Sequence, residues 1–239
     1  MGFLLEFFST YTYLVGVLVL GLIWCLIFFK KRVNRNEMLL AGVMFGAAAV
    51  LLDIQYALYD YWHPAFLVES IPVEDFFYGF FLGGICVQIY FLFFNVKEKL
   101  VNKPHPFFVI ASLFISILSF ILLTGILKLN SIVAHIVPPF AIGSYISFKD
   151  HRDVKVQIWS GFFAIMVSFI AFQIMLLFNP SFVRNIWYLN NLTGILFLGI
   201  PLEEYLFAFS LGFGVSHFYE YVTGKDLILK KPKSLTFRP

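Results

Sequence analysis

Residues 71–80 read Ile-Pro-Val-Glu-Asp-Phe-Phe-Tyr-Gly-Phe, and residues 200–209 repeat the pattern as Ile-Pro-Leu-Glu-Glu-Tyr-Leu-Phe-Ala-Phe. Each copy places two adjacent carboxylates shortly after a proline and directly before an aromatic, apolar run. An ionisable side chain at membrane depth is costly, so it marks a functional site by default. Ten aligned positions of similar chemistry predict a duplicated protein whose site is built from both halves.

The composition of the chain indicates an integral membrane protein. Of its 239 residues 60% are hydrophobic and 13% are charged, and the mean hydropathy is +0.86. A helix needs about 20 residues to cross about 30 Å of hydrocarbon. The first apolar segment lacks a basic n-region and a small-residue cleavage site, so we expect a helix there and not a removed signal peptide. Seven segments are long enough to cross: 9–29, 38–58, 71–94, 106–126, 131–148, 156–178 and 198–219.

The basic residues predict the orientation of these segments. Fifteen of the seventeen Lys and Arg residues fall in connections on one side or in the C-terminal tail, and only Lys128 and Arg184 fall on the other. The positive-inside rule then places the N-terminus outside and the C-terminus in the cytoplasm. The net charge of +3 reflects this topology and gives no indication of nucleic acid. We expect the basic tail to contact anionic membrane lipid.

The position of the two acidic motifs predicts the domain organisation. They open the third and the seventh segments, so three segments precede and include each motif and one segment joins the two units. The predicted fold is therefore all-α, with two parallel three-helix repeats and a linker helix (3+1+3). The predicted units are 1–98, the first repeat; 99–130, the linker helix; 131–222, the second repeat; and 223–239, a basic cytoplasmic tail. Nothing in the sequence predicts the oligomeric state.

Two interpretations of the acidic pairs remain open. Carboxylates that follow a proline in the first helical turn interact favourably with the helix dipole, so Glu74 and Asp75, or Glu203 and Glu204, can serve stability alone. The apolar stretch 194–200 favours a functional role for the second pair, because it predicts a deeper position and a helix break beside it. Adjacent residues on a helix diverge by about 100°. One carboxylate of each pair is therefore expected to face the interior while its neighbour packs sideways.

Asp53 is a fifth candidate acid. It lies near the outer end of the second segment, at a depth similar to that of the motifs, and no intramembrane Lys or Arg is available to pair with it. The alternative is a snorkelling or hydrogen-bonded residue at a helix end. The absence of a cationic partner favours a functional role.

The remaining sequence narrows the chemistry to carboxylic acids. The five histidines show no metal-ligand spacing, and no phosphate-binding or nucleotide-binding loop is present, so we expect neither a metal nor a cofactor. A carboxyl group in a dry cavity can keep its proton and act as a general acid, while an ionised neighbour acts as a base. Aromatic faces stabilise cations such as a carbocation. The best-placed aromatic residues are those beside the acids: Phe76, Phe77, Tyr78, Tyr205 and Phe207.

These features together resemble the lycopene cyclase domain family, the small integral-membrane type of bacteria, archaea and fungi. The resemblance covers most of the chain and includes both acidic motifs, Tyr11 to Leu14, Asp53, Trp62 and Pro64. Family members close the ends of lycopene into ionone rings by proton-initiated, redox-neutral chemistry. The resemblance implies that both acidic pairs are essential and that a carotenoid substrate enters from the bilayer, with Trp62 among its contacts. It also implies a prokaryotic cell membrane as the location.

The chain departs from this family in one respect. The middle helix of the second unit often carries an acid near a tryptophan, whereas this chain offers only Gln173, and Asp53 has no acidic twin. This loss of symmetry is compatible with one working site, an altered product or a relative that has left cyclisation. Neither the ring type nor the carboxylate that donates the proton follows from the sequence.

Three other classes of membrane protein were weighed. An intramembrane prenyl-endopeptidase needs an arginine four residues after its second Glu, where this chain has Gly79 and Ala208. A retinal protein needs a lysine in its seventh helix, and residues 198–219 contain none. A transporter, or a lipid-binding relative with a midplane acidic site, stays as the alternative, because repeats and intramembrane acids are typical of transporters.

Overall fold

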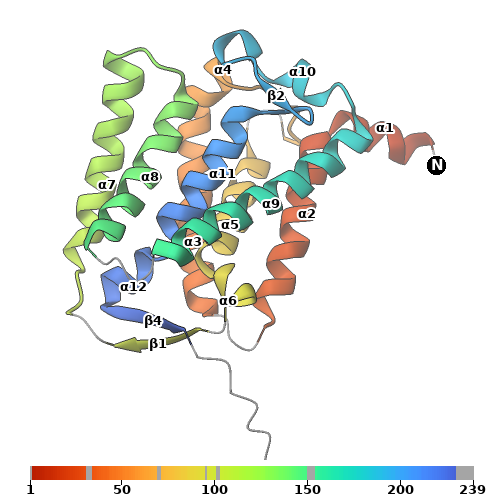
Figure 1. The fold of residues 1–239 in the computed structure, drawn as a ribbon. Helices are drawn as coiled ribbons and strands as arrows, with labels where there is room; N and C mark the ends of the chain where they lie inside the picture. The colour runs from red at the N-terminus through yellow and green to blue at the C-terminus, as the bar shows by residue number, and fades with distance from the viewer. Residues whose placement is uncertain are drawn as a thin grey trace, which may run out of the picture.

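The fold is seen in a computed structural model of the chain. The structure describes residues 2–30, 34–68, 71–94, 96–100, 103–149 and 154–229. Basic residues of the topology prediction at 31–33, 150–153 and 230–239 lie outside the described residues. The described chain is almost entirely helical, as the sequence predicts, and its few strands are short (Figure 1).

The first predicted repeat, residues 1–98, contains seven helical elements and one strand among the described residues. In chain order these are α1 (Gly2–Thr10), α2 (Thr12–Phe28), α3 (Arg35–Leu52), the π-helix η1 (Asp53–Ala57), α4 (Leu58–Asp60), α5 (Val73–Gln88), α6 (Tyr90–Phe93) and β1 (Val96–Leu100), β1 running on to residue 100. The side chain of Asn34 caps α3 by accepting a hydrogen bond from the backbone N–H of Glu37. Pro72 precedes the first turn of α5, so its missing N–H leaves no helical bond unmade.

The remaining helices and strands belong to the predicted linker, the second predicted repeat and the start of the predicted tail. They are α7 (Phe107–Phe120), the π-helix η2 (Ile121–Ile126), α8 (Ser131–Lys149), α9 (Val154–Phe178), α10 (Phe182–Ile186), η4 (Leu189–Asn191), β2 (Leu196–Phe197), β3 (Ile200–Pro201), α11 (Leu202–Val215), α12 (Phe218–Thr223) and β4 (Lys225–Leu229). The predicted helix break before the second motif is confirmed. Strands β2 and β3 form a hairpin whose turn residues, Leu198 and Gly199, have φ of 50° and 82°, and α11 begins directly after it.

Four helical segments among the described residues are long and apolar enough to cross a membrane: Arg35–Leu52, Phe107–Ile126, Ser131–Lys149 and Val154–Phe178. The other three predicted segments are helical as well, but their helices are shorter. Helix α2 has 17 residues, α5 has 16 and α11 has 14, because the chain breaks near Tyr11, Ile89 and Ser216. The sequence overestimated the length of continuous helix, since hydropathy alone does not register such breaks.

The two predicted repeats pack in the same way. Helix α3 packs on α5 and α9 packs on α11, while α2 packs on α5 and α8 packs on α11. Matching glycines allow the closest approach: a Cβ on Gly42 would lie 2.8 Å from the ring of Phe80, and one on Gly161 would lie 2.7 Å from the ring of Phe209. Contacts of α2 with α9 and of α5 with α11 join the two repeats, and α7 lies against α8 on the flank (Figure 1).

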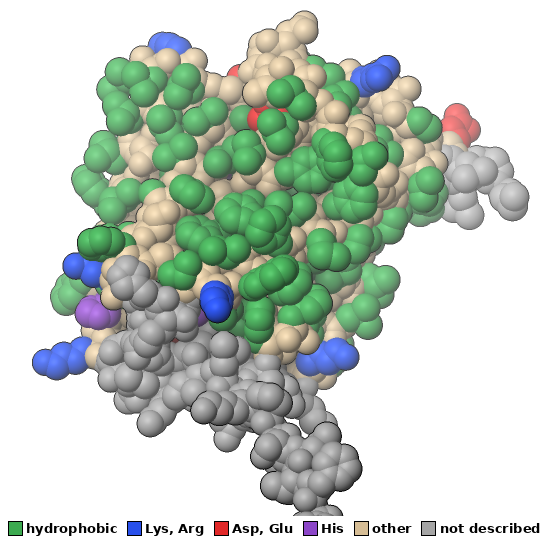
Figure 2. Space-filling model, in the orientation of Figure 1, with side chains coloured by type: hydrophobic (Ala, Val, Ile, Leu, Met, Phe, Trp, Pro, Cys, Tyr) green, Lys and Arg blue, Asp and Glu red, His purple; other side chains and the backbone are tan. Residues whose placement is uncertain are grey.

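The connecting segments gather at the two ends of the molecule. Elements α4, α10 and β2 lie at one end, and β1 and β4 lie at the other (Figure 1). The strand pair β1–β4 was not expected: residues 225–229, assigned to the basic tail, pair antiparallel with residues 96–100. Figure 2 shows hydrophobic side chains over most of the face between the ends, with Lys and Arg toward the ends. This distribution suits a protein surrounded by lipid.

Candidate functional site

A cavity between the two predicted repeats brings acidic and aromatic side chains together. Its volume is about 80 Å³, and it lies beneath the end that carries α4 and α10. The acids on its wall are Asp53 from η1 and Glu204 from α11. Other side chains on the wall come from both repeats and include Tyr61, Trp62, Tyr78, Phe172, Trp187 and Phe207.

A local change of helix type places Asp53 on this wall. The regular helix α3 ends at Leu52, and the next five residues, Asp53–Ala57, form a π-helix. Single π-turns inside helices are frequent at functional sites, because the wider turn shifts the side chains that follow. The sequence analysis singled out this acid but did not predict the π-helix that begins with it.

Asp53 and Asp75 form a buried carboxyl pair. The Asp75 side chain is 1% exposed and interacts with Asp53 and with the Tyr13 hydroxyl. Asp53 also interacts with Trp62. The two Asp75 oxygens and the Tyr13 hydroxyl are close without reaching full hydrogen-bond geometry among the described residues. Asp75 therefore lies directly behind Asp53, which is the member of the pair that lines the cavity.

Glu204, the other acid on the cavity wall, is held differently. The Tyr61 hydroxyl and the Trp187 indole N–H (3.2 Å) both donate hydrogen bonds to Glu204 Oε1. Tyr61 lies outside the predicted membrane spans, and burial, together with the adjacent Glu204 carboxyl, raises the pKa of its hydroxyl well above the usual 10.0. Tyr61 thus stays a neutral donor across the physiological range. Two donors on one oxygen fix the orientation of the Glu204 side chain.

The first acid of each motif has the same structural role in both repeats. Glu74 Oε1 accepts a hydrogen bond from the backbone N–H of Leu67 (2.7 Å), and Glu203 Oε1 accepts one from the backbone N–H of Thr193 (2.7 Å). In each repeat this hydrogen bond links the loop before the helix to the first turn of that helix. Neither residue lines the cavity. All four carboxyl side chains are buried, and the difference is that Glu204 lines the cavity and Asp75 contacts Asp53 on its wall.

The two loops that precede the motifs contact each other and form part of the cavity wall. The backbone N–H of Tyr188 donates to the carbonyl of Tyr61 (2.9 Å), and Trp62 and Trp187 form an isolated antiparallel bridge. The rings of the two tryptophans lie 5.3 Å apart, centroid to centroid. Each repeat therefore contributes one strand-like segment to this bridge. The bridge brings Trp62 and Trp187, which are distant in sequence, to the wall of the same cavity.

Comparison with known families agrees with this two-part site. The family model described as Lycopene cyclase matches two segments of the chain, residues 9–93 and 130–222, which together cover well over half of it. The chain belongs to the lycopene cyclase family. The two matched segments also fit the internal repeat seen in the motifs. Neither a curated protein nor a solved structure matches the chain. With its long apolar helices, this lycopene cyclase family member is a membrane protein of cyclase type.

The structure separates the predicted substrate-contacting residues of this family member into two groups. Trp62, Tyr78 and Phe207 line the cavity. The others point elsewhere: Phe76 packs against Gly46 of α3, Phe77 is 43% exposed, and the Tyr205 hydroxyl donates to the carbonyl of Phe197.

Several residues of the cavity wall were missed by the sequence interpretation. Tyr61 and Trp187 lie between predicted spans and were not among the candidates, and His135 lies near the start of the predicted span 131–148, where it was counted only as one of five histidines without metal-ligand spacing. Phe172 was missed as well. It follows Gly161 by the same number of residues as Asp53 follows the matching Gly42, so Phe172 and Asp53 occupy equivalent positions in the two repeats.

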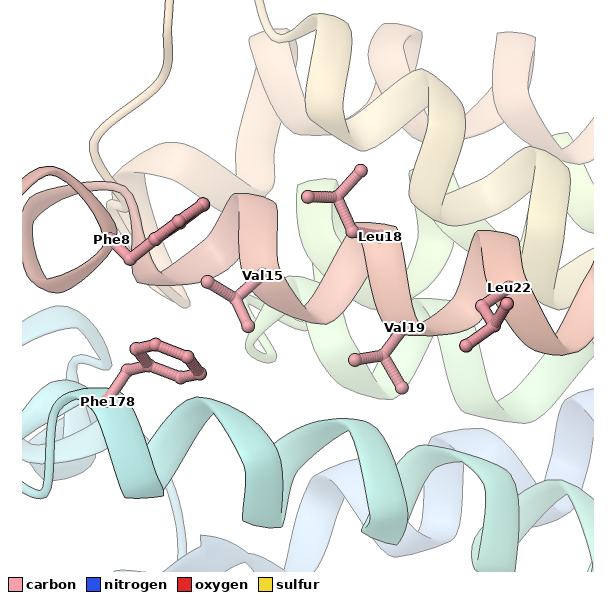
Figure 3. A pocket seen from close by; sticks show the side chains of 6 residues that line it. All are labelled: Phe8, Val15, Leu18, Val19, Leu22 and Phe178. Atoms are coloured by element: carbon pink, nitrogen blue, oxygen red, sulfur yellow. The ribbon is translucent and has the colours of Figure 1, made fainter. Parts of the chain in front are cut away.

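A second, larger cavity lies on the lipid-facing side of α2 and α9. Its volume is about 260 Å³, and Figure 3 shows the six side chains on its wall. These are Phe8, Val15, Leu18, Val19, Leu22 and Phe178. None of the six can donate or accept a proton. This hollow therefore offers no acid or base, in contrast to the cavity lined by Asp53 and Glu204.

Proposed function

We propose that this protein is a carotenoid cyclase that closes the end of a lycopene-type polyene into an ionone ring. The reaction is a proton-initiated, redox-neutral isomerisation inside the membrane and uses carboxylic acids without a cofactor. One observation carries the proposal: in a lycopene cyclase family member, Asp53 and Glu204 line the same cavity, together with several aromatic side chains. Acids supply and balance charge, and the aromatic walls suit a carbocation.

The initiating proton comes from the Asp53–Asp75 pair. Two carboxylates in contact repel each other strongly when both are ionised, and no cation is near either one among the described residues, so the pair holds one proton between its members. Asp53 lines the cavity and is the member that reaches the substrate. Asp75 acts through Asp53, as the positioning partner that shares the proton. Tyr13 supports this exchange because its hydroxyl lies beside Asp75.

The positive charge that follows is stabilised from the other wall. Trp62, Tyr78 and Phe207 present aromatic rings to the cavity, and a ring face attracts a cation with about 0.5–2 kcal/mol. Glu204, oriented by Tyr61 and Trp187, adds a second carboxyl group to the cavity wall. Because the cavity has room for only a few water molecules, the polyene end enters when wall side chains rotate aside.

The membrane placement extends the sequence prediction. We propose seven crossings in a prokaryotic cell membrane, with two three-helix repeats joined by α7, the N-terminus outside and the C-terminus in the cytoplasm. The matching packing of α3 on α5 and of α9 on α11 supports the repeat arrangement. The cavity then lies toward the outer side, and an apolar carotenoid reaches it from the bilayer.

Expression in a lycopene-accumulating bacterium tests the proposal. We expect a product of the same mass as lycopene that absorbs at shorter wavelength, because ring closure shortens the conjugated system. Glu204→Gln keeps the size of the side chain but removes its charge, and should abolish most of the product. Glu6→Gln on the exposed face of α1 is the matched control and should retain it. Unchanged lycopene from folded wild-type protein would overturn the cyclase proposal.

That negative result would favour the alternative kept from the sequence, a transporter or lipid-binding relative with an acidic site at membrane depth. The two readings differ in one measurable respect. A cyclase changes the pigment itself, whereas a transporter or binding protein leaves its chemical structure intact and changes only where it is found.

A further inference from the structure

His135 is the one residue on the wall of the acidic cavity whose side chain can be a neutral base. It lies on α8, one helical turn after Ser131, and is half-buried. Phe120 and Phe207 hold its ring from two sides, with centroid distances of 5.6 and 6.3 Å and nearly perpendicular planes. The proposed function assigns roles to the acids and the aromatic walls. Ring closure also needs a base that removes a proton from the cyclised cation.

The hydrogen bonds of His135 determine which ring nitrogen is free. Nδ1 lies 2.7 Å from the backbone carbonyl oxygen of Ser131. A carbonyl oxygen only accepts, so Nδ1 carries the proton in the neutral ring and Nε2 carries the lone pair. Among the described residues, no group binds Nε2. The basic nitrogen is therefore the one left available on a side chain that lines the cavity.

Asp60 holds the start of the helix that carries His135. Asp60 accepts hydrogen bonds from the backbone N–H (2.8 Å) and the hydroxyl (2.6 Å) of Ser131. These bonds fix the first residue of α8, whose carbonyl oxygen accepts the hydrogen bond from His135 Nδ1. Asp60 and Ser131 thus position His135 without touching the substrate.

We infer that His135 Nε2 is the base that ends the cyclisation and selects the ring double bond. The inference rests on the proposed function. Asp53 transfers its proton to C2 of the terminal C1=C2 double bond, C1 bonds to C6 of the C5=C6 double bond, and the positive charge moves to C5. His135 then removes a proton from C6 or from C4, which leaves the ring double bond at C5=C6 or at C4=C5.

The proton inventory closes within the same cavity. After the product leaves, the imidazolium returns its proton to the Asp53–Asp75 pair through water, for which the cavity has room. No oxidant or reductant is consumed, and substrate and product are isomers. The position of Nε2 relative to C4 and C6 then decides between the two ring types.

Two substitutions separate a base from a structural residue. In His135→Asn the side-chain amide takes the place of Nδ1 and can still donate to Ser131, whereas in His135→Gln it takes the place of Nε2. Neither amide is basic. We expect both variants to fold and to lose at least about tenfold in conversion per folded molecule, as general-base removal does. We also expect the residual product to show a changed ratio of the two ring types. His105→Asn, an exposed histidine at the opposite end, is the matched control.

Each outcome decides between the proposals. Amounts of folded protein are measured by size-exclusion chromatography in detergent, so if one variant misfolds the other is read alone. If the wild type cyclises and His135→Asn matches it in rate and ring ratio, His135 is structural and the inference is overturned while the cyclase proposal stands. If folded wild-type protein leaves lycopene unchanged, both proposals are overturned. A solvent-deuterium label at C2 identifies the initiating step and should be retained in the residual product of both variants.

Discussion

The surroundings of the two acidic motifs differ much more than the motifs themselves. In the first repeat, Asp75 meets a second carboxyl group, Asp53, and the Tyr13 hydroxyl. In the second repeat, Glu204 receives two hydrogen bonds, from Tyr61 and Trp187. One environment brings two carboxyl groups into contact, and the other holds a single carboxyl group in one orientation with two donors.

The parts that hold the helices together are alike in both repeats. The first acid of each motif binds a backbone N–H of its loop at 2.7 Å, and a glycine of the middle helix admits a phenylalanine of the third helix at nearly the same distance. Duplication therefore preserved the scaffold, while the residues around the second acid diverged. The position of Asp53 in the first repeat corresponds to Phe172 in the second, so a single donor site is expected.

Removing the donor should have the largest effect. Asp53→Asn keeps the size of the side chain but leaves no transferable proton, and conversion should fall by about 10²- to 10⁴-fold. Its counterpart Phe172→Leu removes only one aromatic wall and should cost about threefold to thirtyfold. Pigment analysis of cells with equal amounts of folded protein compares the two. Equal losses from both substitutions would contradict a single donor on the Asp53 side.

Loosening Glu204 should have an intermediate effect. Tyr61→Phe removes one of its two donors, which lowers conversion by about tenfold if a buried hydrogen bond to a charged group contributes about 1.5–3 kcal/mol. Tyr13→Phe is the matched change in the first repeat and should cost less, because the Tyr13 hydroxyl makes no full hydrogen bond among the described residues. Since the pKa of Tyr61 lies above 10.0, activity of the wild type should show no loss from its ionisation up to that pH. A larger loss of conversion in Tyr13→Phe than in Tyr61→Phe would contradict the expectation that the hydrogen bond to Glu204 matters more than the contact of Tyr13 with Asp75.

Changing the first acid of each motif should have the smallest effect, and the same one in both repeats. Glu74→Gln and Glu203→Gln keep an oxygen that can accept the loop N–H, so conversion per folded molecule should change by no more than about threefold. Alanine at either position removes the acceptor and should lower the melting temperature in detergent. A loss of conversion in the Gln variants as large as that of Asp53→Asn would mean that these carboxyl groups take part in the reaction after all.

Much of the fold follows from local sequence signals. The helical segments lie where the hydropathy predicts them, and the break before the second motif follows from Gly199 and Pro201. The lengths of α2, α5 and α11 did not follow, because interruptions near Tyr11, Ile89 and Ser216 carry no hydropathy signal. Neither did the pairing of β1 with β4, which joins segments far apart in the chain.

The sequence by itself determined the membrane class, the duplicated acidic motifs and the set of five carboxyl groups, because composition, repetition and the cost of intramembrane charge are readable along the chain. Only the tertiary structure decided which acid of each pair reaches the interior. Adjacent helical residues diverge by about 100°, so the choice depends on where the neighbouring loops and helices supply donors. The same long-range packing brought Tyr61 to Glu204 and His135 to the cavity wall, across more than a hundred residues in the first case.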